Sequence, residues 1–546
     1  MEASPLTVVL VAFAINCLVS PIPEVSTELY VFPYIAINLA FYFHLCSRSY
    51  AQYHILTSIG SANSIFLTSS AIISIVRRLF FSPLRKFPGP KLAAVSGLWN
   101  AIEAGLGRAS RTHKALHEKY TSDIIRIGPN ELSINSVDAI EKLYGGKYIR
   151  GTFNQVFNIP GGENVATLRD QKLHGAWRRM LLKAFSKSEL SRMTERIQTH
   201  VDRTIAILHQ KASSSVDCGQ LLDAFAFDVI SHLGFSYDSG FQDGYGDMTP
   251  LNSIPSFLRF VSFAGHLPHL QQILRYLPLP DEPFIKLANQ IMAAHESREG
   301  KSQDILSHLL VPDTETNLGL SPADVKQHVL LLLTVGAHSI GTTLTCIFAA
   351  LASRPEIQEN LRKEIDSTST LHGVLSSVEI GKLKLLESVV KEALRMFGPL
   401  QGGTPAIVPK GGIILDTGII LPEYTQVYVG QHVIGMDERY FIRAKEFLPE
   451  RWMEDSIGKG NNSLIKDRRA WIPFGYGTHA CGGRALAIEE LKLMVARVIR
   501  EFRVDFPQDL GRPFDFDAWV DGIKDHFLTV IEKMELTFTP WVDIQR

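Results

Sequence analysis

One cysteine in the last part of the chain lies in a loop whose composition suits a metal ligand. Cys481 follows glycines 475 and 477 and precedes glycines 482 and 483, and an amphipathic helix is expected from Arg484 to Arg500. Glycines let the backbone turn tightly and leave room for a flat cofactor. Backbone N–H groups at a helix start favour a thiolate. This arrangement suits axial ligation of haem iron, where electron donation by sulfur favours O–O cleavage.

Two other interpretations of the same loop stay open at this point. A lone cysteine is often a small buried apolar residue. Gly475, Gly477 and Ala480 also fit the dinucleotide pattern G-x-G-x-x-A before a helix. Pro473 would interrupt the strand that this pattern requires, and too little chain follows for a second βαβ half.

Charged residues upstream predict an ion cluster. Glu392 and Arg395 lie three residues apart on a helix expected from Leu383 to Met396, so both point to one face. Arg451 follows in Pro449-Glu450-Arg451-Trp452. In most proteins such a pair is a weak surface contact.

The order of these motifs resembles that of the cytochrome P450 family. The loop matches F-x-x-G-x-[RH]-x-C-x-G at Phe474, Gly477, His479, Cys481 and Gly483. E-x-x-R and P-E-R-W precede it in the family's order. The resemblance spans residues 81–546 and includes a proline-rich hinge at 87–90. It implies a mainly α fold with small β-sheets, heme b with Cys481 as axial ligand to the iron, and a structural cluster of Glu392, Arg395 and Arg451.

The resemblance also implies residues that hold the haem propionates. His174 and Arg178 are similar to the family's H-x-x-x-R and share one helix face. A basic solvated face is the alternative. Ala406 stands where many relatives have arginine or histidine. His479 stands where arginine is commonest, so we expect a weaker contact that depends on pH.

The helix expected from Ser321 to Ser353 departs from the family at its oxygen-activating segment. His338 and Ser339 occupy the positions of the usual acid and threonine. We expect both to deliver protons, since a serine hydroxyl donates hydrogen bonds and histidine titrates in the right range. His338 as a packed polar residue is the alternative. An alignment shifted by one residue places Ile340 at the alcohol position and favours a rearrangement without net oxygen insertion.

The first 80 residues differ in composition from the rest. Ala3–Pro23, Leu29–Ser47 and Ile55–Val76 are uncharged and long enough to cross a bilayer. Arginines and lysine at 77, 78, 85 and 86 predict a cytosolic side for everything beyond Phe80. We therefore expect a membrane anchor of one to three helices over residues 1–80, a haem domain over 81–546, and an endoplasmic reticulum location.

Beyond the anchor, helical periodicity dominates. The expected helices are Arg111–Thr121, Asp170–Ala184, Lys187–Gln210, Asp223–Leu233, Phe284–Arg298 and Ser321–Ser353. The expected strands are Ile124–Ile127, Leu132–Ile134, Ile413–Leu415, Thr425–Val429 and a C-terminal pair, Leu528–Ile531 with Glu535–Thr539. The apolar stretch Ile254–Leu279 is expected either to roof the substrate entrance at the membrane or to be a core helix. A glycosylation pattern at Asn461 would face the cytosol unmodified.

The net charge of −1 predicts no affinity for nucleic acid, and five scattered cysteines show no disulfide spacing. The resemblance implies a haem-thiolate monooxygenase that takes electrons from NADPH through a cytochrome P450 reductase. The hinge resembles that of filamentous-fungal members of secondary metabolism, which implies a lipophilic natural-product substrate. Arg179, Lys183 and Lys187 are expected to form part of the reductase-binding face. Oxidative rearrangement, desaturation or ring coupling, an NAD(P)-dependent oxidoreductase and a lipid receptor are the alternatives.

Overall fold

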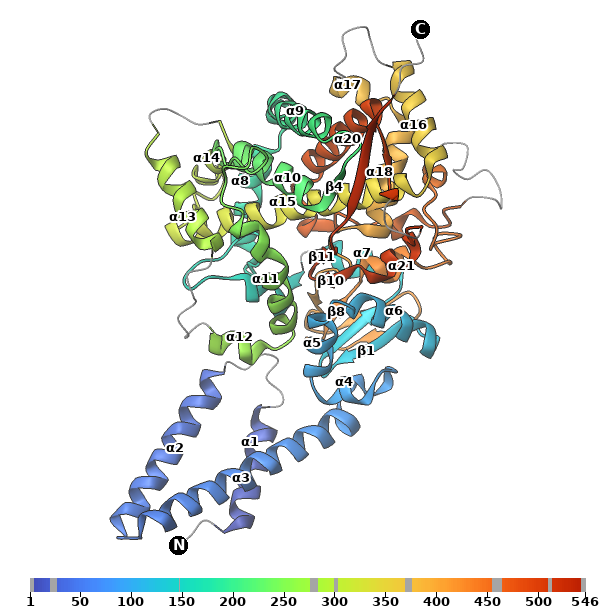
Figure 1. Ribbon diagram of the computed structural model, residues 1–546. Helices are drawn as coiled ribbons and strands as arrows, with labels where there is room; N and C mark the ends of the chain where they lie inside the picture. The colour runs from blue at the N-terminus through green and yellow to red at the C-terminus, as the bar shows by residue number, and fades with distance from the viewer. Residues whose placement is uncertain are drawn as a thin grey trace.

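The computed structural model describes residues 4–19, 27–146, 148–274, 283–298, 303–368, 376–453, 464–508 and 513–541. Three helices project from one end of the molecule, and a larger helix-rich body carries the rest of the chain (Figure 1). The mainly helical fold with small sheets, preceded by apolar N-terminal helices, is confirmed. The glycosylation pattern at Asn461 lies outside the described residues.

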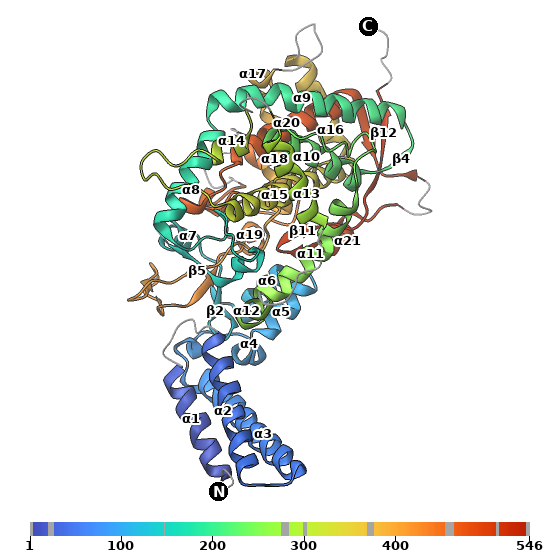
Figure 2. The same ribbon diagram turned by 90° about the vertical axis from the view of Figure 1, so that its left-hand side faces the viewer.

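The projecting helices are α1 (Pro5–Val19), α2 (Glu28–Ser47) and α3 (Gln52–Val76), and they lie side by side in both views (Figures 1 and 2). By length and composition, α2 and the helical stretch Gln52–Phe81 qualify as membrane spans, and α1 is a shorter apolar helix. Most of their large apolar side chains are exposed. A membrane is the environment in which such exposure is favourable.

Polar side chains join these apolar helices to one another. The hydroxyl of Tyr34 donates to Oδ1 of Asn63 at 2.8 Å, and the amide of Asn63 donates to Oδ1 of Asn38 at 2.7 Å. Ser74 donates to Oδ1 of Asn16 at 2.9 Å. Hydrogen bonds of this kind hold transmembrane helices together, because lipid offers no alternative partner.

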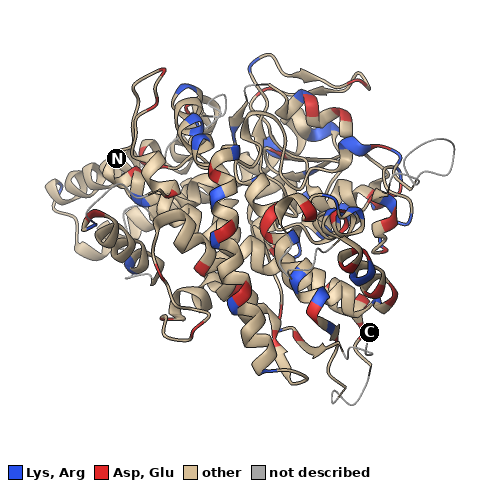
Figure 3. Ribbon diagram, turned by 90° about the horizontal axis from the view of Figure 1, so that it is seen from above, with Lys and Arg blue, Asp and Glu red and all other residues tan. Residues whose placement is uncertain are grey.

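The body contains small helices around a few long ones. Its helices are α4 (Lys91–Val95), α5 (Leu98–Gly105), α6 (Ala109–Tyr120), α7 (Val137–Tyr144), α8 (Gln171–Ala184), α9 (Lys187–Gln210), α10 (Cys218–Phe235), α11 (Thr249–Gly265), α12 (Pro268–Leu274), α13 (Pro283–Glu296), α14 (Ile305–Leu309), α15 (Pro322–Ala352), α16 (Pro355–Thr368), α17 (Ser377–Ile380), α18 (Lys384–Phe397), α19 (Gln431–Gly435), α20 (Arg484–Glu501) and α21 (Phe516–Gly522). Charged residues of both signs are spread over these helices (Figure 3).

The strands are short. They are β1 (Ile124–Gly128), β2 (Glu131–Ile134), β3 (Ile149–Arg150), β4 (Ser215–Asp217), β5 (Ala406–Ile407), β6 (Ile413–Ile414), β7 (Ile420–Leu421), β8 (Gln426–Tyr428), β9 (Phe502–Asp505), β10 (Lys524–His526), β11 (Leu528–Val530) and β12 (Glu535–Pro540). The largest sheet has the order β1-β2-β8-β5-β3. The expected pairing of the two C-terminal strands is wrong, because β11 pairs with β10 whereas β12 pairs with β4 and β9. A local pattern of apolar residues does not specify a strand's partner.

The long helix α15 forms the axis of the body. Its first turn carries the expected N-cap: the Ser321 hydroxyl accepts from the Asp324 N–H at 3.2 Å, and the Asp324 carboxylate accepts from the Ser321 N–H at 3.1 Å. Most of the helix is buried, and α10, α18 and α20 pack against it. The expected start of α10 was too late, since the helix begins at Cys218, capped by Asp217.

The stretch Ile254–Leu279 forms the end of α11 and α12, and residues 275–279 lie outside the described part. One face is buried at Ile254, Leu258 and Val261, whereas Phe260 and Ile273 are exposed. A contact joins this region to the anchor, because the Thr27 hydroxyl lies 2.9 Å from Nδ1 of His269. The stretch therefore packs on the core and also meets the anchor.

Candidate active site

The loop around Cys481 is a tight turn closed by its own backbone. The N–H of Cys481 donates to the carbonyl oxygen of Phe474 at 2.7 Å. Gly475 and Gly477 have φ of 69° and 67°, a region that favours glycine. A Cβ at Gly477 would lie 1.8 Å from the carbonyl oxygen of Tyr144. The loop therefore requires glycine at 477 for both its conformation and its packing.

Cys481 precedes α20, whose N-cap is Gly483. Burial raises the pKa of the Cys481 thiol, while the Gly483 N–H and the guanidinium groups of Arg178 and Arg484 lower it by less. The expected effect of the helix start is present, but desolvation outweighs it. A bound metal cation would supply the missing stabilisation of the thiolate. The residue remains exposed, so the sulfur is open to a ligand.

The expected propionate residues gather beside this loop. The rings of His174 and His479 lie with their centroids 4.0 Å apart, and Nη1 of Arg178 donates to the carbonyl oxygen of Ala480 at 2.8 Å. Burial and neighbouring cations lower the pKa of His174 to about 4 and that of His479 to about 3. Both histidines are therefore neutral near pH 7, and the pH dependence expected for His479 lies outside the physiological range.

Arg150 is a residue of this cluster that the sequence did not reveal. It lies on β3 with its Cα directly opposite that of Ala406 on β5, and its Nε donates to Nδ1 of His479 at 3.0 Å. A cation thus stands across the sheet from the position where the family's basic residue is missing. The signal was out of reach because the pairing of β3 with β5 joins segments far apart in the chain.

The charge of this cluster suits an anionic cofactor. Arg150 is buried, and Arg178 is partly buried. The pKa of each is lowered by desolvation, and the charged or polar groups that act on them are tyrosines, Cys481 and each other. No carboxylate of the described residues forms an ion pair with either guanidinium. Two propionate groups would neutralise them, so the residues fit a haem above Cys481.

The ion cluster expected near the loop is present and fully buried. Nε and Nη2 of Arg395 lie 2.9 and 2.8 Å from the Glu392 carboxylate oxygens, and Nε of Arg451 lies 2.8 Å from Oε1 of Glu392. The N–H of Leu448 and the indole of Trp452 also donate to Glu392. Burial raises the pKa of Glu392, but the two arginines outweigh it and the pKa is lowered.

The two residues expected to deliver protons point to different neighbours. His338 is buried and faces α10 and β11, with Nε2 at 3.1 Å from the carbonyl oxygen of Thr529. The hydroxyl of Ser339 donates within the helix to the carbonyl oxygen of Val335 at 2.6 Å. Val335 is among the exposed large apolar residues, which shows that this part of α15 borders open space.

Aromatic rings from three distant segments meet beside β11. Phe527 stands at the turn between β10 and β11 with φ of 65°, which is unusual for a bulky residue. Its ring centroid lies 5.5 Å from that of Phe153 and 4.6 Å from that of Phe157, and Phe157 contacts Phe257 on α11. Strained residues cluster at functional sites. The sequence gave no sign of this cluster, because its members are joined only in the fold.

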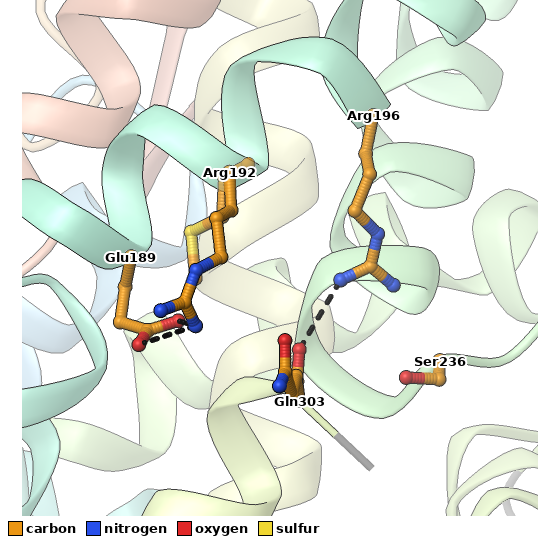
Figure 4. Close-up of a pocket in the computed structure, with 6 residues that line it drawn as sticks. Glu189, Arg192, Arg196, Ser236 and Gln303 are labelled. Atoms are coloured by element: carbon orange, nitrogen blue, oxygen red, sulfur yellow. Dashed lines mark hydrogen bonds and ion pairs between the residues drawn. The ribbon is translucent and has the colours of Figure 1, made fainter.

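A surface pocket of about 290 Å³ lies elsewhere, between α9 and the ends of α10 and α14 (Figure 4). Arg192 pairs there with Glu189 at 3.0 Å, and Arg196 donates to the carbonyl oxygen of Gln303 at 3.3 Å. None of the six lining residues belongs to the cysteine loop, α8 or α15. Its cations already have partners, so the site at Cys481 is the one with unneutralised charge.

The expected reductase-binding face needs one correction. Nε and Nη2 of Arg179 lie 3.0 and 2.7 Å from the Asp313 carboxylate oxygens, and Glu315 lies 3.4 Å away. Arg179 is therefore an intramolecular ion-pair partner rather than a free cation. Lys183 remains on the surface.

The family model described as Cytochrome P450 matches residues 88–533, so the chain belongs to the cytochrome P450 family. Cytochrome P450 67 of Uromyces fabae is 30% identical over 488 residues, covering 85% of this chain and 87% of that protein. Cytochrome P450 monooxygenase FCK2 of Fusarium pseudograminearum is 26% identical, with 89% and 87% covered. Tryprostatin B 6-hydroxylase of Neosartorya fischeri is 27% identical, with 85% and 83% covered.

The chain is a cytochrome P450 monooxygenase, an enzyme with haem-thiolate iron that uses O2 and a redox partner. The dinucleotide interpretation of the glycine loop is wrong. The described residues just before the loop form a 3-10 turn, Arg468–Ala470, and not the strand that a nucleotide fold requires.

Proposed function

We propose that this monooxygenase holds heme b on the Cys481 thiolate and oxidises a lipophilic natural product of secondary metabolism. The observation that carries the proposal is the pair of buried, unneutralised guanidinium groups of Arg150 and Arg178 beside the cysteine loop. Bound haem with a thiolate ligand supplies O2 activation and insertion of one oxygen atom into a C–H bond.

The surrounding residues have separate tasks in this proposal. Arg150, Arg178, His174 and His479 bind and orient the two propionates. Phe474, Gly477 and Gly483 shape the loop that presents the sulfur, and the cluster around Glu392 holds the segment that leads into it. The aromatic side chains around Phe527 bind an apolar substrate and exclude water. His338 and Ser339 hold protons for the distal side.

The anchor is proposed to cross the membrane three times, as an endoplasmic reticulum protein with a cytosolic haem domain. The polar contacts between its helices and their exposed apolar surface support three packed spans. Three spans place the N-terminus in the lumen. A glycosylation tag added before Pro5 should be modified, and the same tag inserted between α1 and α2 should not be.

Spectroscopy and turnover of the purified full-length chain test the catalytic part. The reduced carbon monoxide complex should show the red-shifted Soret band of a thiolate ligand, and Cys481→Ser should lose it. With NADPH and a P450 reductase, a strain expressing the wild type should accumulate a metabolite that a Cys481→Ser strain lacks. A mass increase of one oxygen atom supports oxygenation, whereas a product without added oxygen favours rearrangement, desaturation or coupling. A chain that binds no haem would contradict the proposal.

A further inference from the structure

The long helix α15 carries a buried histidine whose two ring nitrogens face different elements. Nε2 of His338 lies 3.1 Å from the carbonyl oxygen of Thr529 on β11, and Nδ1 lies 3.4 Å from Oδ2 of Asp223 on α10. The hydroxyl of Thr342, one turn along α15, lies 3.4 Å from Nε2. His338 is 4% exposed, whereas the side chain of Asp223 is 25% exposed. The imidazole therefore connects the protein interior to a carboxylate that solvent reaches.

The contacts of the ring decide its protonation. A carbonyl oxygen only accepts hydrogen bonds, so Nε2 must carry a hydrogen to bond Thr529. An ionised carboxylate also only accepts, so an attractive contact at Nδ1 requires a second hydrogen. Both nitrogens are then protonated, and His338 is an imidazolium paired with the Asp223 carboxylate. Burial alone lowers the pKa of His338, but the Asp223 charge and the two acceptors outweigh it and the pKa is raised.

The pair has room to tighten or to include a water molecule. Nδ1 of His338 and Oδ1 of Asp223 both lack a hydrogen-bond partner among the described residues. At 3.4 Å, the ion pair is longer than a direct hydrogen bond of this type. Buried polar atoms without partners are rare, and a bridging water would satisfy both atoms.

A glycine permits α10 to approach this closely. A Cβ at Gly341 would lie 2.1 Å from Oδ1 of Asp223 and 2.8 Å from its Cα. Because the second atom belongs to the backbone, rotation of the Asp223 side chain cannot make room, and α10 would have to move. Glycine inside a helix costs about 1 kcal/mol relative to alanine, so its presence here serves the contact between the two helices.

We propose that Asp223 is the positioning residue for proton delivery in this enzyme: from α10, it keeps His338 protonated and oriented. The inference rests on the proposed function and adds to it, because the family places this acid on the long helix itself. His338 releases one proton toward the distal hydroxyl groups and becomes neutral. One proton from solvent, entering beside the exposed carboxylate of Asp223, restores the imidazolium. No further reactant is needed.

The first test measures the protonation of His338 without catalysis. NMR of the full-length protein labelled with ¹⁵N-histidine, assigned by its difference from His338→Gln, should show both ring nitrogens protonated near pH 7. In Asp223→Asn the pKa of His338 should fall by at least about one unit, a tenfold change in the protonated fraction. Asp223→Glu should restore much of the pKa. Asp202→Asn, which removes a carboxylate on the exposed face of α9, should leave it unchanged. A neutral His338 in the wild type would overturn the inference.

The second test measures product formed per NADPH consumed as a function of pH. The contribution of protonated His338 is present below its pKa and is lost as the pH rises through that value. The alkaline fall in coupling should therefore move to lower pH in Asp223→Asn, with coupling near pH 7 reduced about tenfold. Gly341→Ala should behave like Asp223→Asn.

The two proposals fail separately. If the wild type lacks the thiolate spectrum, the proposed function fails. If the spectrum and turnover are normal but Asp223→Asn keeps the wild-type pH profile, only the role of Asp223 is overturned.

Discussion

The cysteine side of the site and the α15 side handle buried charge in opposite ways. On the cysteine side, Glu392 is enclosed by Arg395 and Arg451 at hydrogen-bonding distance, and each of the three side chains is at most 1% exposed. On the α15 side, Asp223 meets His338 at 3.4 Å and remains partly exposed. A closed cluster resists change in protonation, whereas a loose pair next to solvent permits it. The first therefore supports structure and the second suits proton movement.

The origin of the contacts differs as well. Glu392, Arg395 and Arg451 belong to two short motifs in the same third of the chain as the cysteine loop. The contacts of His338 come from α10 and β11, which lie far from it on either side in the sequence. Proximity in the chain made the first set visible as a pattern. The second set exists only where the folded elements meet.

The largest effect is expected on the cysteine side, for Glu392→Gln. This change leaves two buried guanidinium groups without their charge partner, which costs about 3–5 kcal/mol of unfolding free energy. Denaturant unfolding should show the loss, and Glu450→Gln in the neighbouring exposed position should be close to neutral. Since the pKa of Glu392 is lowered, the wild-type advantage should persist down to the ordinary pKa of glutamate, about 4.3, and disappear at lower pH. Equal stability of the two variants would contradict a closed cluster.

Arg150→Gln tests the unneutralised cations between the two sides. Losing a charged hydrogen bond of about 2 kcal/mol should raise the rate of haem transfer to an acceptor protein about 30-fold. Because Ala406 stands directly opposite on β5, the double change Arg150→Gln with Ala406→Arg should recover much of the retention. Arg443→Gln removes an exposed cation and is the control. Unchanged transfer in Arg150→Gln would remove this residue from the propionate site.

Phe527→Gly should change selectivity more than stability. Glycine relieves a positive φ worth about 1–2 kcal/mol, which offsets part of the lost ring packing. We expect a changed ratio of products, measured by mass spectrometry, with an unfolding free energy within about 2 kcal/mol of the wild type. Phe527→Leu keeps apolar bulk and should fall between the two. An unaltered product ratio in both variants would place the substrate away from this cluster.

The smallest effect concerns the anchor, which belongs to neither side. Asn63→Leu removes the contacts with Tyr34 and Asn38, and such bonds between membrane helices average about 0.6 kcal/mol. A double-mutant cycle with Asn38→Leu in lipid bilayers should give coupling of this size. Haem content should be unchanged, and a drop in haem content would show that the anchor supports the catalytic body.

Local patterns predicted the long helices well, for physical reasons that act within a few residues. α9 runs over Lys187–Gln210 as expected, and Ser321 and Asp324 close the capping box that starts α15. The pairing of β11 with β10, by contrast, was missed, because apolar alternation shows that a strand exists but not which strand lies beside it.

The sequence by itself determined the cysteine loop, the ion cluster and the apolar anchor, because each depends on residue types at short, regular spacing. Only the tertiary structure decided which groups compensate for the departures from the family's pattern. Arg150 stands opposite Ala406 through a strand pairing, and Asp223 reaches His338 through the gap at Gly341. Charge acts through space, so a missing group can be replaced from any part of the chain that folding brings within a few ångströms.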